Sequence, residues 1–141
     1  MPLNETLPAD INERLATLGE AIADASPDVV FAYVFGSIDT PRRTPRSDVD
    51  LAVYAAGTAD REDLRLSVAA AASQHLGTDA VDVVLLNMAP LSLAGRVLTT
   101  RRVILDRQPF IRHQYESLTA RMFSDFRIHE HRLLAQRFAR G

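Results

Sequence analysis

The chain has 141 residues, 47% of them apolar, a formal net charge of −2 and no cysteine. This length fits one domain with its own core, and the missing cysteine excludes disulfides, thiolate catalysis and cysteine-ligated zinc. All 16 basic residues are arginines, which excludes a P-loop lysine and a lysyl–nucleotide intermediate. We expect a cytoplasmic protein, because no apolar run is long enough to span a membrane and the N-terminus has no secretory signal pattern.

The first half of the chain predicts a helix followed by two strands. Apolar residues at helical spacing predict a helix over 10–25, with Asp10 and Glu13 as a capping box. The β-branched and aromatic run Val29–Phe35 predicts a strand buried on both faces. Residues 36–47 have loop chemistry, and a second strand follows at Val49–Tyr54. Since this loop is too short for a crossover helix, we expect an antiparallel or mixed pairing of the strands.

The second half of the chain continues the alternation of helices and strands. It predicts, in order, a helix over 60–76 that ends at Gly77, a strand at Ala80–Leu86, a short helix at Pro90–Thr99, an edge strand at Arg102–Leu105 and a long helix from Pro109 to about Arg137. We therefore expect one α/β domain over 1–141, with a core at about 10–106 and a C-terminal helical segment at about 109–139.

Charge divides unevenly along the chain. Residues 1–100 carry 7 arginines against 14 acids, and residues 101–141 carry 9 arginines against 4 acids. The basic end is either a solvated, arginine-rich helix or a surface for an acidic partner or a nucleotide.

Three carboxylates stand in strands that are otherwise apolar. Asp48 and Asp50 lie two residues apart, so their side chains point to the same face of one strand. Asp82 interrupts the next strand in the chain, and if the two strands are neighbours the three carboxylates converge. Three like charges a few ångströms apart are unfavourable alone. A divalent cation resolves the repulsion, and oxygen-only ligands favour Mg²⁺ or Mn²⁺.

A Gly-Ser pair ends the first strand, ten residues before the paired aspartates. Gly36 allows backbone N–H groups to approach a bulky anion, and Ser37 adds a hydroxyl donor. Together they are candidates to hold a triphosphate opposite an aspartate-bound metal.

These residues resemble the GSx10DxD signature of the polymerase-β-like nucleotidyltransferase superfamily. Phe35 before the Gly-Ser pair and Ser47 before the aspartates also match. The chain is most similar to the minimal nucleotidyltransferases, the MntA-type antitoxins that pair with HEPN-domain toxins. The resemblance implies a polymerase-β-like fold, an α/β structure with a small mixed sheet, flanking helices and a long C-terminal helix.

The resemblance also implies a role for each residue. Asp48 and Asp50 would bridge two Mg²⁺ ions, and Asp82 would bind the catalytic ion and help to deprotonate the acceptor. Gly36 and Ser37 would hold the β- and γ-phosphates of ATP. The implied reaction transfers AMP from ATP to a tyrosine of the HEPN toxin, which is a ribonuclease, and silences it.

The Gly-Ser loop departs from the family pattern at two positions. Ile38 and Pro41 stand where members commonly have arginine and glycine. Either Arg46 replaces the missing phosphate ligand, with Arg42 and Arg43 as alternatives, or all three arginines belong to a solvated loop.

Two other functions remain open at this point. One is an antitoxin that neutralises its toxin by binding alone, and the other is a nucleotidyltransferase with a small-molecule acceptor of the aminoglycoside type. We expect a hetero-oligomer with the toxin, no membrane association and no direct binding of nucleic acid.

Overall fold

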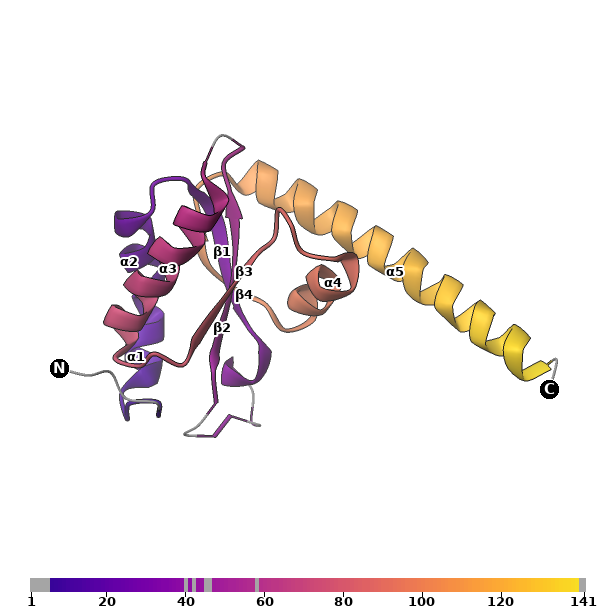
Figure 1. The fold of residues 1–141 in the computed structure, drawn as a ribbon, viewed down its shortest axis with the longest axis horizontal. Coiled ribbons are helices and arrows are strands. Elements are labelled where there is room, and N and C mark those ends of the chain that lie inside the picture. Colours follow the sequence, from indigo (N-terminus) through magenta and orange to yellow (C-terminus); the bar gives the residue numbers. More distant parts are fainter. Residues whose placement is uncertain (1–5, 40, 42, 45–46, 58, 140–141) are drawn as a thin grey trace.

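The computed structural model describes residues 6–39, 41, 43–44, 47–57 and 59–139. Their strands form one four-stranded sheet in the order β3-β2-β1-β4, with helices on both of its faces (Figure 1). β1 (Val29–Phe35) is central and pairs antiparallel with both β2 (Val49–Ala55) and β4 (Arg102–Asp106). β3 (Val81–Leu85) runs parallel to β2. The predicted mixed sheet, the antiparallel first pair and the edge strand are confirmed.

One face of the sheet is covered by α1 (Ile11–Ala16), α2 (Leu18–Ala25) and α3 (Arg61–Leu76). Odd-numbered residues of β2 and β3 point into this layer, where they pack against buried residues of all three helices. Asp60 caps the start of α3, where its side chain accepts the Asp63 N–H at 3.0 Å, and Gly77, with φ +72°, caps its end. Both ends follow ordinary capping rules, and the prediction of Gly77 as the helix stop is confirmed.

The predicted single helix over 10–25 is wrong, because the chain breaks it at Thr17. The Thr17 hydroxyl donates to the Arg14 carbonyl at 3.3 Å and contacts Nε2 of His75 at 2.7 Å. A threonine that bonds to nearby backbone in this way competes with helix continuation. The predicted capping box is also wrong, since Asp10 makes no side-chain cap and instead accepts from Nε of Arg14 at 3.0 Å.

The opposite face of the sheet is covered by α4 (Leu91–Thr100) and the first part of α5 (Pro109–Ala139), as Figure 1 shows. The centre of this layer is Phe31, which stacks on Tyr54 with ring centroids 4.9 Å apart. Tyr33 and Tyr115 pack against the same ring at 5.4 and 5.6 Å. The aromatic cluster joins β1, β2 and α5, and each of these tyrosines is buried or half-buried.

A network of ion pairs fixes α5 to the sheet. Buried Glu116 accepts from Nε of Arg101 and from Nη1 of Arg112, both at 2.5 Å. Arg112 also donates to Asp106 at 2.8 Å, at the end of β4. Burial, followed by the negative charge of Glu116, raises the pKa of Tyr33 far above its usual range. Tyr33 is therefore a neutral core residue and not a nucleophile.

α5 continues well past the sheet and projects from the body of the protein (Figure 1). Every residue from Ser124 to Arg137 is exposed. Within the described residues, no helix is both long enough and apolar enough to cross a membrane.

Candidate functional site

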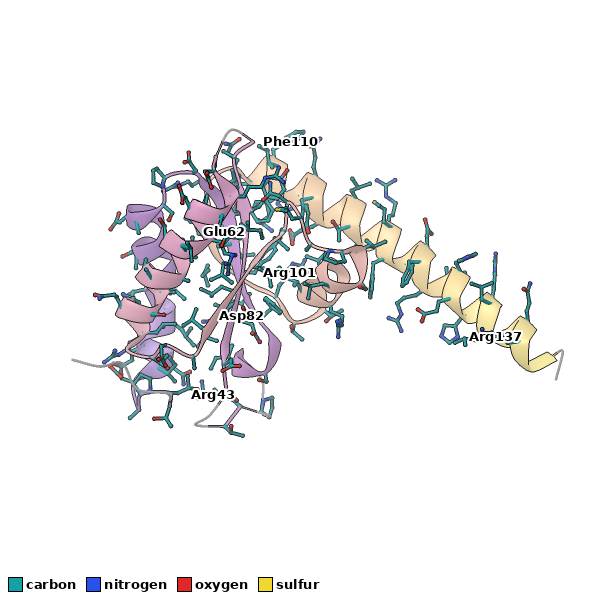
Figure 2. All side chains as sticks on the ribbon, in the orientation of Figure 1. Arg43, Glu62, Asp82, Arg101, Phe110 and Arg137 are labelled. Atoms are coloured by element: carbon teal, nitrogen blue, oxygen red, sulfur yellow. The ribbon has the colours of Figure 1, made fainter. Side chains whose placement is uncertain are left out.

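The fold brings Asp48, Asp50 and Asp82 to one face of the sheet. Asp50 and Asp82 are register partners on the parallel strands β2 and β3, and Asp48 directly precedes β2. Ala52, two residues after Asp50, belongs to the layer beneath α4 and α5. Alternation along the strand therefore turns the aspartates toward the α4/α5 side. Figure 2 labels Asp82 on β3, which forms the edge of the sheet opposite β4.

The three carboxylates interact electrostatically. Asp50 is half-buried, whereas Asp48 and Asp82 are exposed. Burial raises the pKa of Asp50 above its usual range, and the negative charges of Asp82 and Asp48 raise it further. An excess of negative charge that is partly withdrawn from water is what a bound cation would relieve.

The three carboxylates are suitable ligands for a hard cation, but their side chains do not converge on one point in this structure. Among the described residues, no three His, Asp or Glu side chains lie close enough together to hold a metal ion. The backbone places Asp50 and Asp82 side by side, and all three donors are carboxylate oxygens, which Mg²⁺ prefers. Ligation therefore requires rotation of the aspartate side chains and no change of strand register.

Gly36 lies directly against the central aspartate. Its φ is +81°, and a Cβ at this position would stand 2.7 Å from Oδ2 of Asp50. Only glycine combines this backbone conformation with so close a carboxylate. η1 (Gly36–Asp39) follows, and its Ile38 is buried in the core beneath α1–α3. The position where the family commonly has arginine thus anchors the loop to the core in this chain.

Thr100, at the end of α4, is a site residue that the sequence reasoning missed. Its hydroxyl accepts the Gly36 N–H at 2.9 Å, across 64 residues of sequence. The amide that was predicted to hold phosphate is therefore already bonded within the protein. No motif marks Thr100, because its contact depends on how α4 packs over the end of β1.

Of the arginines in the Gly-Ser loop, Arg43 lies within the described residues. Arg46, the predicted phosphate ligand, and its alternative Arg42 lie outside the described residues. Arg43 donates to Oδ1 of Asn12 at 2.5 Å, which ties the loop to α1. On α3, Arg65 pairs with Glu62 at 2.5 Å, and Glu62, followed more weakly by Asp82, raises the pKa of Arg65. The main partner of Arg65 is thus Glu62 on its own helix, and Asp82 is the one aspartate of the three that affects it.

Gly36→Ala tests the contact between Gly36 and Asp50. We expect a loss of about 1–2 kcal/mol in the free energy of unfolding, because alanine is strained at positive φ and its Cβ meets Asp50. Urea denaturation measures this loss. Gly57→Ala is the matched control, since a Cβ there meets nothing within 4 Å. Equal stabilities of the two variants would contradict the assignment.

Residues 20–110, more than half of the chain, match the family model for polymerase beta nucleotidyltransferases. Among solved structures, the fold is similar to a chain of the tri-AMPylated Shewanella oneidensis HEPN toxin in complex with MNT antitoxin. The two chains are 23% identical, with 90% of this chain and 98% of that chain covered and a TM-score of 0.66.

Two further toxin–antitoxin structures share the fold. A structure with AMP-PNP is 24% identical, with 88% of this chain and 98% of that chain covered and a TM-score of 0.69. The MntA–HepT structure is 22% identical, with 90% and 98% covered and a TM-score of 0.65. No curated protein matches the sequence significantly. The matched range includes the sheet, the Gly-Ser turn and the three aspartates, and the chain belongs to the polymerase beta nucleotidyltransferase family.

Proposed function

We propose that this protein is an antitoxin that transfers AMP from ATP to a tyrosine of a HEPN-domain toxin. The observation that carries the proposal is the register of Asp50 beside Asp82, together with the effect of both Asp82 and Asp48 on the pKa of Asp50. The fold shared with an MNT antitoxin bound to a tri-AMPylated HEPN toxin supports the choice of substrate. The structure of a related toxin–antitoxin with AMP-PNP supports an adenine nucleotide as the donor.

The three aspartates would hold Mg²⁺, which when bound stabilises the charge that develops on the attacking and leaving oxygens. In the proposed reaction, the tyrosine oxygen bonds to the α-phosphorus, the bond from that phosphorus to the bridging oxygen breaks, and pyrophosphate leaves. The exposed carboxylate of Asp82 is the candidate to take the tyrosine proton. Gly36 and Ser37 are proposed to orient the β- and γ-phosphates at the start of η1, with Arg46 as a further ligand.

Label transfer tests this function. The cognate HEPN protein is incubated with this chain, Mg²⁺ and ATP labelled at the α-phosphate. We expect label on the HEPN protein, and none with the Asp48→Asn variant, because asparagine removes a negative ligand of the ion. Transfer of label from ATP that carries the isotope at the γ-phosphate would indicate a kinase and contradict the proposal. The absence of a gene for a HEPN protein next to the gene for this chain would also contradict it.

A second candidate is an antitoxin that acts by binding alone. Two observations favour it: the Gly36 N–H is already bonded to Thr100, and a buried isoleucine, which cannot bind phosphate, stands at position 38 where the family commonly has arginine. In that case the complex forms and silences the toxin, no label is transferred, and the Asp48→Asn variant protects as well as the wild type.

A further inference from the structure

A cavity of about 660 Å³ lies between α4 and α5, on the same side of the sheet as the aspartates. Leu98, Ala120 and Phe123 give it an apolar lining, and Ile128 extends this lining along α5. At Gly95 a Cβ would collide with the Phe123 ring. Glycine therefore lets Phe123 lie directly against α4, and the cavity opens beyond that contact, where α5 leaves the body of the protein.

The cavity is bordered by uncompensated positive charge. Glu116 is the acid that lines it, and this carboxylate already bonds to Arg101 and Arg112. Arg127 lies over the Phe123 ring, with its guanidinium carbon 5.8 Å from the centroid. Neither Arg127 nor Arg132 forms an ion pair with a carboxylate in the part of the chain that the structure describes. An acidic occupant would complement both arginines.

The exposed part of α5 also lacks packing that would stabilise it. The residues from Ser124 to Arg137 are all exposed, although this stretch contains Phe126, Ile128, Leu133 and Leu134. Isolated helices of this length are marginal in water, and most helices depend on burial of an apolar face. Of these apolar side chains, Ile128 lines the cavity, so an occupant of the cavity would bury it and stabilise this part of the helix.

We propose that this cavity is the docking site for the protein substrate and receives an acidic, amphipathic segment of the HEPN toxin. This inference rests on the proposed function. The apolar lining would bury the segment's apolar side chains, and Arg127 and Arg132 would pair with its carboxylates. Docking here places the toxin on the face that carries Asp48, Asp50 and Asp82. The cavity also adjoins Thr99, next to the Thr100 hydroxyl that holds the Gly36 amide.

Two matched pairs of variants test the docking site. Ile128→Asp and Leu133→Asp each replace a branched apolar residue by aspartate on the same helix, at positions with nearly equal exposure, 49% and 50%. Only Ile128 lines the cavity. Arg127→Glu and Arg137→Glu form the second pair, because Arg137 lies near the far end of α5 (Figure 2).

The readout is the Kd for the purified cognate HEPN protein, measured by calorimetry, with circular dichroism to check helix content. We expect Ile128→Asp and Arg127→Glu each to weaken binding by about tenfold or more, and their partners to bind like the wild type. Equal effects within a pair, or a larger effect of Leu133→Asp, would overturn the proposal and leave the proposed function intact.

Two other outcomes distinguish a failure of the docking site from a failure of the proposed function. If the HEPN protein does not bind the wild-type chain, the proposed function fails and the docking site fails with it. If the wild-type chain binds single-stranded RNA and the Ile128→Asp and Arg127→Glu variants do not, the cavity is an RNA-binding site and its assignment to a protein segment is wrong.

Discussion

The Asp50→Asn variant is expected to lose nucleotidyl transfer by at least about a thousandfold, since a metal-ion clamp contributes several kcal/mol to the transition state. The same variant is expected to unfold at a higher temperature than the wild type when both are metal-free at neutral pH. Burial and the charges of Asp82 and Asp48 disfavour the ionised form of Asp50 in the folded protein. Asparagine has a similar shape and no charge to withdraw from water.

The pH dependence of this gain follows from the direction of the pKa shift. The folded protein binds the Asp50 proton more tightly than the unfolded chain, so this group stabilises the fold most below the usual aspartate pKa of 3.8. That stability is lost as the pH rises through the raised pKa. The advantage of Asp50→Asn should therefore be present at neutral pH and vanish in acid.

Thermal unfolding between neutral and acid pH, with and without Mg²⁺, measures both effects. Mg²⁺ should raise the Tm of the wild type, because an ion that binds only the folded state stabilises it, and should leave Asp50→Asn unchanged. Two results would contradict this account of Asp50 as an unfavourable charge that binds Mg²⁺. One is an Asp50→Asn variant that is less stable than the wild type at neutral pH, and the other is a variant whose Tm still rises with Mg²⁺.

Phe31→Ala is expected to lower the free energy of unfolding by about 3–5 kcal/mol, the usual cost of removing a fully buried aromatic ring. Phe31 is wholly buried and packs against Tyr33, Tyr54 and Tyr115. Its removal leaves a cavity at the point where β1, β2 and α5 meet. Since Tyr115 attaches α5 to the sheet through this ring, hydrogen exchange should also quicken in the first turns of α5.

Urea denaturation measures this loss, with Phe31→Leu as the control that keeps an apolar side chain in the cluster. We expect the leucine variant to retain most of the stability that the alanine variant loses. A cost below about 1 kcal/mol for Phe31→Ala would mean that the cluster collapses around the vacancy and does not hold α5 in place.

The strands were predictable from the sequence because the pattern of apolar residues that identifies a strand lies within the strand itself. A buried central strand needs a continuous apolar run, so Val29–Phe35 and Val49–Ala55 stand out from the loops around them. The proximity of Asp50 and Asp82 was also predictable, since a carboxylate in a buried strand needs a reason to be there. Their pairing in register confirms that these two carboxylates lie side by side.

What the sequence did not reveal depends on contacts between distant residues. The break at Thr17 follows from its bond to the Arg14 carbonyl and its contact with His75, 58 residues away. Thr100 reaches Gly36 only because α4 crosses the end of β1. The sequence left the role of the basic C-terminal segment open, and the structure divides its arginines: Arg101 and Arg112 bond to Glu116, whereas Arg127 borders an open cavity. Hydrogen bonds and ion pairs between distant residues leave no pattern in the sequence around either partner.

The order of the strands in the sheet bears on how the protein is made. β1 lies at the centre, but its outer edge is covered by β4, which leaves the ribosome more than 60 residues later. Arg107, just after β4, donates to the carbonyls of Ala23, Pro27 and Val29, and so completes the turn that leads into β1. Until that segment emerges, the nascent chain carries an apolar strand with an open edge, which is prone to pair with other chains. Chaperone protection or rapid translation through residue 107 should therefore determine the yield of this protein.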